Sequence, residues 1–326
     1  MPLALLIGIG AGVVSAVLFA SAATGTLLGL LVLFFLSPLP VAIAGLGWGW
    51  QSAAAAAAAS AAVIMFALSG RAALFHLLAL GLPTVVLSYL CLLNREIAPA
   101  GNGADAKLEW YPIGRIVMVA AVWAGALAAL ALLTTASDIE GLRAALKQTF
   151  ERIFVLSPPG SPTGAETLGE REISAFTELM VLTFAAAVAT MWMTLATLNL
   201  WLAGLVTWQS GRLARPWPEL AALRLPRTAP LAFAVAIVLT FLPGYGGLIA
   251  SGFASAFLFA YTLLGLAIIH YVTRPLSARG LVLGAVYGAL VILYPFSWLL
   301  LAALGLAEPI SPLRRRLPPP GSEPST

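Results

Sequence analysis

Residues 45–60 are GLGWGWQSAAAAAAAS, and this stretch decides the solvent in which the chain folds. Three glycines alternate with leucine and tryptophan before a run of seven alanines. Such a composition belongs either to a flexible linker or to a helix in a membrane. Alanine is the best helix former, and the run continues into AAVIMFALS, so we predict a transmembrane helix over 49–69. Trp48 and Trp50 are then interfacial anchors.

The composition of the whole chain is that of a membrane protein. It is 61% hydrophobic and 9% charged, with a mean hydropathy of +0.98, whereas a soluble domain carries about 25% charged residues. Apolar stretches of about 20 residues, each able to cross ~30 Å of hydrocarbon, follow one another. We expect an all-α fold, a polytopic transmembrane helix bundle of about eight to nine spans. The expected spans are 3–22, 25–46 (broken by SPLP at 37–40), 49–69, 72–93 (interrupted by GLP at 81–83), one ending near 135, 173–205, 229–243, 248–272 and 280–304.

The longest extramembrane segment is expected at 136–172. Ser137 and Glu140 form a capping box there. An amphipathic helix on the membrane surface is predicted over 138–154, because apolar residues recur on one helical face: Ile139, Leu142, Leu146, Phe150 and Ile153. We expect one integral membrane domain over 1–306 and a disordered tail, rich in proline and arginine, over 307–326.

The sequence offers little material for metal or catalytic chemistry. Cys91 is the only cysteine, and the two histidines, His76 and His270, lie in separate segments. All acidic residues fall in loops or near span ends, with Glu178 the deepest, and no nucleotide-binding or hydrolase motif is present. We therefore expect no metal, no cofactor, no catalytic residue and no enzymatic activity. The net charge of +4 comes from loop arginines and indicates membrane topology, not nucleic-acid binding.

A few polar residues inside the spans are candidates for a ligand cavity. Asn199 lies far from any charged helix end and either bonds across helices or contacts a ligand. Trp192 and Trp201 are the candidate apolar walls beside it, in a cavity that the 138–154 helix would cover. His76 either lines a cavity or bonds a neighbouring helix, and His270 is expected at the interface.

Small residues recur at every fourth position in the first and last spans. Such stripes let helix backbones approach closely. They serve either packing within this chain or contact with another membrane subunit. The residues proposed for a partner helix are Ala4, Gly8 and Gly12 in the first span and Gly280, Gly284 and Gly288 in the last.

The distribution of arginine predicts the orientation of the chain. The compact 209–230 loop contains four arginines and is expected in the cytoplasm, which places the N-terminus there too. A break of the last span at Pro295 would return Arg314–Arg316 to the same side. The basic residues are fifteen arginines and two lysines, a bias typical of GC-rich bacterial genomes, so the expected location is the bacterial cytoplasmic (inner) membrane.

Three stretches resemble the YybS-like family of bacterial membrane proteins, a domain of unknown function. They are SPLPVAIAGLGWGWQSAAAA (37–56), YTLLGLAIIHYVTR (261–274) and LGLAEPISPLRRR (304–316). Glu308 and Arg314–Arg316 take the places of the acidic residue and the arginines in the family's tail. The family is grouped by fold with the S components of energy-coupling-factor vitamin transporters. In those proteins a small-residue stripe on the first helix docks the coupling subunit, and Ala4, Gly8 and Gly12 resemble that stripe.

Two functions from different classes follow. The favoured hypothesis is a substrate-binding or transport-related membrane subunit that relies on a separate ATPase. The alternative is a non-transporting membrane scaffold or envelope assembly factor, and a lipid-modifying enzyme ranks third. The expected partners are the lipid bilayer, an unknown small-molecule ligand and, where the stripes face outward, another membrane subunit.

Overall fold

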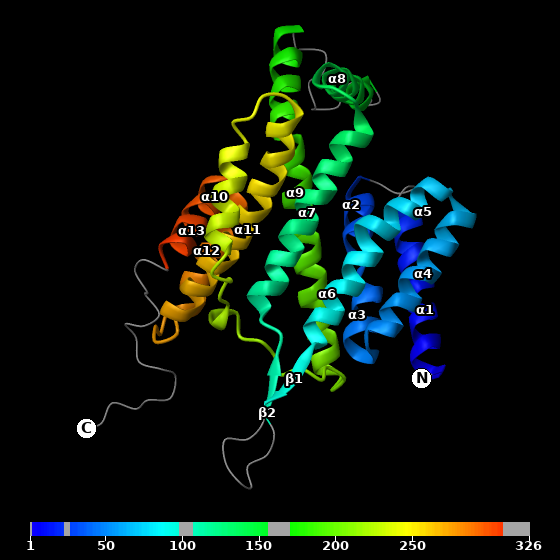
Figure 1. Cartoon of the computed structure of the whole chain (residues 1–326), viewed down its shortest axis with the longest axis vertical. Helices are drawn as coiled ribbons and strands as arrows, with labels where there is room; N and C mark the ends of the chain where they lie inside the picture. The colour runs from blue at the N-terminus through cyan, green and yellow to red at the C-terminus, as the bar shows by residue number, and fades with distance from the viewer. Residues whose placement is uncertain (1, 23–26, 98–106, 156–169, 309–326) are drawn as a thin grey trace. The chain divides into compact units, whose positions relative to one another are not determined.

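The computed structural model describes residues 2–22, 27–97, 107–155 and 170–308. Within them the chain is almost entirely helical, and the all-α bundle is confirmed. The one exception is a short antiparallel hairpin, β1 (Asn94–Ile97) with β2 (Lys107–Trp110), in which Asn94 pairs with Trp110. The helices are α1 (Pro2–Ala22), α2 (Leu27–Leu36), α3 (Leu39–Trp48), α4 (Trp50–Ala67), α5 (Gly70–His76), the π-helical turn η1 (Leu77–Gly81), α6 (Leu82–Leu92), α7 (Ile113–Thr135), α8 (Ile139–Val155), α9 (Glu170–Gln209), the 3-10 turn η3 (Leu220–Ala222), α10 (Ala229–Leu239), α11 (Tyr245–Val272), α12 (Arg279–Ile292) and α13 (Phe296–Ala307) (Figure 1).

Seven segments of the described chain are long and apolar enough to cross a membrane. They are Pro2–Ala22, Leu31–Trp48, Trp50–Ala67, Gly70–Leu92, Ile113–Thr135, Arg171–Gln209 and Tyr245–Val272. The seventh and ninth predicted spans differ, because each is shorter than expected. The seventh is the 11-residue α10, and the ninth is broken before Pro295 into α12 and α13, of 14 and 12 residues.

The predicted interruption of the fourth span at 81–83 takes an unexpected form. The helix continues through Pro83 from Gly70 to Leu92. Proline has no N–H to donate to the carbonyl four residues earlier, and its ring crowds that carbonyl. The wider π-helical turn over Leu77–Gly81 lies immediately before it, and such a turn lets a helix absorb the mismatch without ending.

The chain forms two compact units. Unit 1 comprises residues 1–120, 194–226 and 261–326, and unit 2 comprises 121–193 and 227–260. The expectation of one membrane domain over 1–306 stays a prediction, and residues 309–326 of the predicted tail lie outside the described residues.

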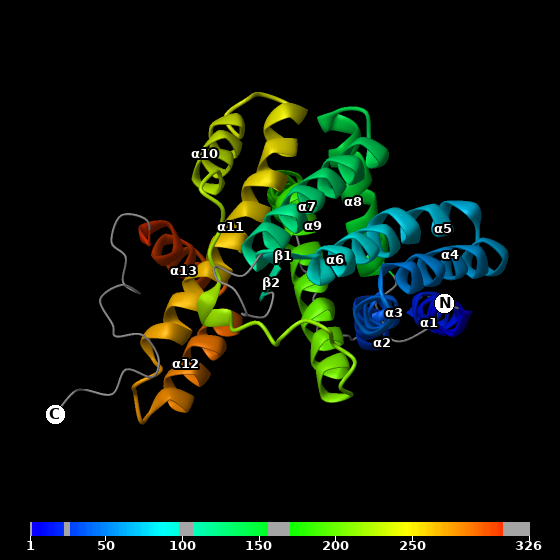
Figure 2. The ribbon, with the colours of Figure 1, turned by 60° about the horizontal axis from the view of Figure 1, so that its bottom comes forward.

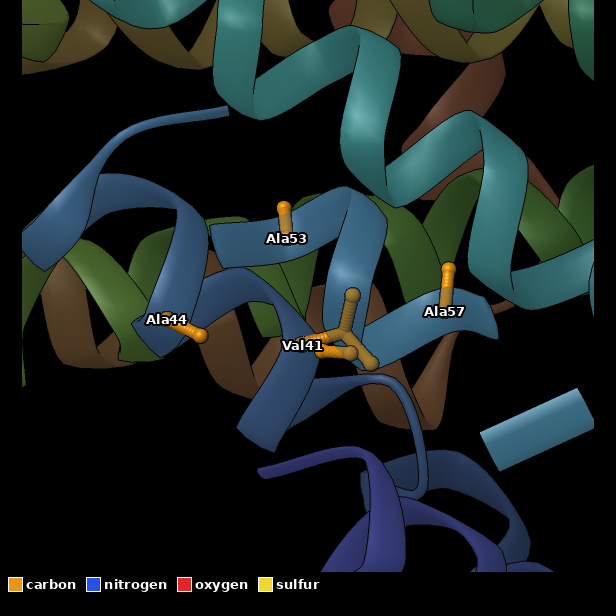
Figure 3. Close-up of a cluster of buried hydrophobic side chains, with 5 residues drawn as sticks. Val41, Ala44, Ala53 and Ala57 are labelled. Atoms are coloured by element: carbon orange, nitrogen blue, oxygen red, sulfur yellow. The ribbon is translucent and has the colours of Figure 1, made fainter. Parts of the chain in front are cut away.

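The core of unit 1 is built from small side chains. Figures 1 and 2 show α1, α4 and α5 side by side. Figure 3 shows the buried cluster between α3 and α4, which consists of Val41, Ala44, Ala53, Ala56 and Ala57. The alanine run, residues 53–59, is therefore a packing surface in unit 1, because side chains this small let helices come close together.

A second close crossing in unit 1 joins α11 and α13. A Cβ added to Gly265 would lie 2.7 Å from the carbonyl carbon of Leu301, and one added to Gly305 would lie 3.2 Å from the Gly265 nitrogen. Thr262 also donates its hydroxyl to the Trp298 carbonyl, at 3.2 Å. Glycine is required here because the two backbones touch.

Unit 2 contains the predicted amphipathic helix as α8, and its place on the membrane surface stays a prediction. Leu142 and Leu146 of α8 are buried, while Glu140 and Lys147 are exposed. The side chains of Phe150 and Ile153 lie outside the described residues. The predicted capping box is replaced by Asp138, whose carboxylate accepts the Gly141 N–H at 2.7 Å.

Ion pairing anchors α8 to α9 within unit 2. The Arg143 guanidinium binds the Glu178 carboxylate with two hydrogen bonds, one of them of 3.1 Å from Nη2 to Oε2, and also pairs with Glu140. These bonds raise the pKa of Arg143 above its ordinary value. Tyr245 of α11 donates its hydroxyl toward the Ala136 and Asp138 carbonyls, each at 3.0 Å, which holds the turn before α8.

Candidate functional site

The candidate site is centred on the break between α2 and α3, in unit 1. The break is at Ser37–Pro38, inside the spanning segment Leu31–Trp48. Pro38 and Pro40 carry no N–H, so the carbonyls of Phe34 and Leu36 lose their usual helical donors. Ser37 compensates at Phe34, whose carbonyl accepts the Ser37 N–H at 3.2 Å and its hydroxyl at 2.9 Å.

Two other helices send polar side chains to this break. Asn199 of α9 is 2% exposed, and its Nδ2 donates to the Phe35 carbonyl at 2.6 Å and to the Leu195 carbonyl at 2.8 Å. Ser15 of α1 donates its hydroxyl to the Ser37 carbonyl at 2.6 Å. Carbonyls that a continuous helix would satisfy are thus bonded from elsewhere in the fold, as a backbone in hydrocarbon requires.

His76 joins the same cluster from the end of α5. It is fully buried, and its Nε2 lies 3.0 Å from the Ser60 hydroxyl of α4 and 3.5 Å from the Ser15 hydroxyl. The Phe19 ring packs edge-on against the imidazole, with ring centroids 4.9 Å apart. We call Ser15, Ser60, His76 and Asn199, together with the Phe35 and Ser37 carbonyls, the polar cluster.

The polar cluster lies deep within its helices. Ser15, Ser60 and Asn199 are about 10–15 Å from the nearest end of their helices at 1.5 Å per residue. Polar groups at this depth are expensive in a membrane and are usually functional. Two atoms of the cluster, His76 Nδ1 and Asn199 Oδ1, are buried and have no hydrogen-bond partner in the described part of the chain.

The predicted tryptophan walls have different positions on α9. Trp192 is buried at 6% exposure and lies seven residues before Asn199, which is two turns and therefore the same helical face. Trp201 is 53% exposed and lies about 200° around the helix from Asn199. Trp201 is therefore not on the Asn199 face. The α8 helix, predicted as a cover, belongs to unit 2, where it contacts α9 at Glu178, and its role as a cover stays a prediction.

The stripe on the first helix packs within unit 1. Cβ atoms added to Gly8 and Gly12 would collide with the Ser52 and Ala56 carbonyls of α4, and the Ser52 hydroxyl donates to the Ala4 carbonyl at 2.8 Å. The first-helix stripe therefore serves packing within this chain, one of the two uses expected from the sequence. The stripe on α12 is different, since no atom of the described residues lies within 4 Å of a Cβ added to Gly280, Gly284 or Gly288.

Arginine and tryptophan gather in unit 1 beside the loop that follows α9. Arg212 lies over the Trp48 ring at 5.4 Å, and Arg215 lies over the Trp110 ring at 6.0 Å. The Arg215 guanidinium also donates to the Cys91 carbonyl at 3.2 Å, and burial lowers its pKa. Cation–π contacts of this kind are favourable, and the interfacial role of Trp48 stays a prediction.

Sequence reasoning singled out Asn199 and His76 but missed the three serines at the same site. Ser15, Ser37 and Ser60 are all fully buried. The available signal was weak: each is a lone hydroxyl within an apolar stretch. Among the described residues, no group of three or more His, Cys, Asp or Glu side chains is placed to hold a metal ion.

Comparison with known proteins identifies the family of the chain. Searches of curated proteins and of solved structures each find no match. A family model described as "Predicted membrane protein (DUF2232)" matches residues 13–308, nearly the whole chain and all of the polar cluster. The chain therefore belongs to the DUF2232 family of predicted membrane proteins.

Proposed function

We propose that this protein is a substrate-binding or transport-related membrane subunit without an ATPase of its own. The observation that carries the proposal is the α2–α3 break, whose Phe35 and Ser37 carbonyls are bonded by Asn199 and Ser15 from two other helices. Irregular backbone at membrane depth occurs where it is buried in protein or lines a cavity. Discontinuous helices of this kind form the substrate sites of many transporters.

The cluster supports binding better than catalysis, so the proposal includes no enzymatic activity. His76 and Ser60 lie 3.0 Å apart, as a base and a nucleophile would. However, the Ala57 carbonyl, 2.9 Å from the Ser60 hydroxyl, competes with the imidazole for the single hydroxyl proton. A serine nucleophile needs that proton taken by an adjacent base.

The proposal has two further parts, a separate ATPase as the energy source and another membrane subunit as a partner. The first rests on the missing nucleotide-binding motif and the second on the glycine face of α12. No nucleotide-binding motif was found in the sequence, so transport would need a separate ATPase. The YybS-like resemblance and its grouping with S components belong to this proposal, as does the bacterial inner membrane. Because α4 fills the Gly8–Gly12 stripe, the open Gly280–Gly288 face of α12 is the better candidate surface for another membrane subunit.

The alternative, a non-transporting scaffold or envelope assembly factor, also has an observation in its favour. No residue of α12 is buried, and its glycines face open space. A helix of this kind fits a protein whose task is to hold other membrane helices. This alternative gives the polar cluster no ligand.

Native mass spectrometry of the gently purified protein separates the two functions. The proposal predicts a small molecule bound to the wild type and lost from Asn199→Ala. It predicts retention in Thr183→Ala, a matched control on α9 whose exposed hydroxyl bonds only its own helix, at 2.7 Å from the Leu179 carbonyl. A protein that never carries a ligand and never co-purifies with a subunit bearing an ATPase motif would favour the scaffold.

A further inference from the structure

The hydrogen atoms of the polar cluster can be assigned, because both serine hydroxyls have a backbone carbonyl as an acceptor. Ser15 donates to the Ser37 carbonyl at 2.6 Å, and Ser60 donates to the Ala57 carbonyl at 2.9 Å. The Ser60 proton could instead point to His76 Nε2, 3.0 Å away, but His76 would then hold its own proton on Nδ1, buried and without an acceptor in the described part of the chain. With both hydroxyl protons on the carbonyls, every proton of the group has an acceptor. The two serine oxygens can then only accept from His76. His76 is therefore the tautomer that carries its proton on Nε2.

This tautomer leaves His76 Nδ1 as a bare acceptor. A neutral imidazole has one N–H and one lone pair. The Nδ1 lone pair is buried and has no partner in the described part of the chain. The two serine hydroxyls and the edge of Phe19 contact the ring, and none of these three offers Nδ1 a donor.

Asn199 presents a second acceptor by the same accounting. Its two Nδ2 protons are used by the Phe35 and Leu195 carbonyls. A flipped amide would place Oδ1 against those carbonyl oxygens, which repel it, so the orientation is fixed. Asn199 Oδ1 is buried and has no partner within the described residues. Both open atoms of the cluster are therefore acceptors.

We propose that the polar cluster recognises the hydrogen-bond-donating end of an otherwise apolar small molecule, through His76 Nδ1 and Asn199 Oδ1. The ligand class is a hydroxyl, amine or ring N–H on an apolar body. Asn199 bonds the Phe35 carbonyl, and His76 reaches the Ser37 carbonyl through Ser15, so both acceptors adjoin the same short break. A carboxylate or phosphate is rejected, since its oxygens would face acceptors. This inference rests on the proposed substrate-binding function.

The tautomer is tested directly by nitrogen NMR of the wild-type protein labelled with ¹⁵N-histidine in lipid nanodiscs. The chain has two histidines, and a His270→Asn variant assigns the His76 signals without touching the cluster. We expect His76 with a protonated Nε2 and an unprotonated Nδ1. A proton on Nδ1 would overturn the hydrogen assignment and the ligand class with it.

The ligand class is tested with indole and 1-methylindole as matched probes. Indole donates one N–H and accepts nothing, whereas 1-methylindole has the same shape without the donor. We expect indole to shift the His76 Nδ1 signal and to bind at least about tenfold more tightly than 1-methylindole, the effect of one hydrogen bond to an otherwise unsatisfied buried acceptor. Equal responses, or no response to either probe, would overturn the donor class.

Native mass spectrometry of the purified protein distinguishes a wrong ligand class from a wrong proposed function. A co-purified ligand without any hydroxyl or N–H would refute the donor class and leave substrate binding intact. Absence of any ligand, together with silent probes, would refute both.

Discussion

Replacing Gly12 and Gly284 with leucine compares a buried and an open glycine on two membrane helices. A Cβ at Gly12 would lie 2.8 Å from the Ala59 Cβ and still closer to the Ala56 carbonyl oxygen, whereas within the described part of the chain no atom lies within 4 Å of a Cβ at Gly284. Carbon atoms pack at about 3.5–4.0 Å. Leucine at Gly12 must therefore push α1 away from α4, and leucine at Gly284 displaces nothing.

The expected magnitudes follow from two opposing terms. Leucine gains about 0.7 kcal/mol over glycine in helix propensity at either position. Overpacking costs about 1–3 kcal/mol and applies only at Gly12. Gly284→Leu should raise the free energy of unfolding by about 0.7 kcal/mol, and Gly12→Leu should lower it by about 0.3–2 kcal/mol. The propensity term cancels between the variants, so their difference isolates the overpacking cost.

Equilibrium unfolding in mixtures of dodecyl maltoside and SDS, followed by tryptophan fluorescence and circular dichroism, measures both variants against the wild type. The α1–α4 crossing is refuted if the two substitutions change the free energy of unfolding by the same amount within about 0.5 kcal/mol, the usual effect of a surface substitution. A Gly12→Leu protein that keeps its stability but loses a membrane partner would instead restore the intermolecular role of the first-helix stripe.

Three further outcomes are expected. Asn199→Ala should lower the free energy of unfolding by about 0.6–1.7 kcal/mol, the range for interhelical hydrogen bonds in membranes, while Thr183→Ala changes it little; equal effects would count against the bond to the helix break. Glu178→Gln should speed backbone hydrogen exchange in α8, because the carboxylate that binds Arg143 is lost, while Glu140→Gln, altered at an outward-facing carboxylate, should do so much less; unchanged exchange in both would show that the buried leucines alone hold α8. A reporter inserted within 209–230 should be active in the cytoplasm, and activity only on the other side of the membrane would reverse the orientation.

The bundle and the amphipathic helix could be predicted because they depend on local sequence alone. Apolar length identifies a span, and the spacing of Leu142 and Leu146 identifies the buried face of α8. The break at Ser37–Pro38 was also predictable from SPLP at 37–40, since proline removes backbone donors. Pro83 has the same chemistry but only widens one turn, so proline alone does not distinguish a break from a bulge.

The serine partners could not be predicted, because a hydroxyl in a membrane helix has two equivalent options. Thr183 bonds the carbonyl four residues earlier in its own helix, whereas Ser15 bonds a carbonyl in the break between α2 and α3. The choice depends on which helix crosses at that level, which is a property of the tertiary structure. For the same reason the sequence left Asn199 open between packing and binding. The two donated bonds use only the nitrogen of the amide, and the buried Oδ1 has no partner in the described part of the chain. This open acceptor favours binding over packing alone.

The contact of α1 with α4 also determines how these two helices can move. Gly8 and Gly12 lie against Ser52 and Ala56 with no side chain between the backbones, whereas further along the same contact Ile64 of α4 packs with Ala16 and Phe19 of α1. A slide of α1 along α4 would therefore have to separate Phe19 from Ile64 and bring residues larger than glycine against the α4 backbone. The hydroxyl hydrogen bonds of Ser52 and Ser15 oppose that slide. Because the Ser15 hydroxyl binds the Ser37 carbonyl at the α2–α3 break, a slide of the first helix along α4 would also displace the break.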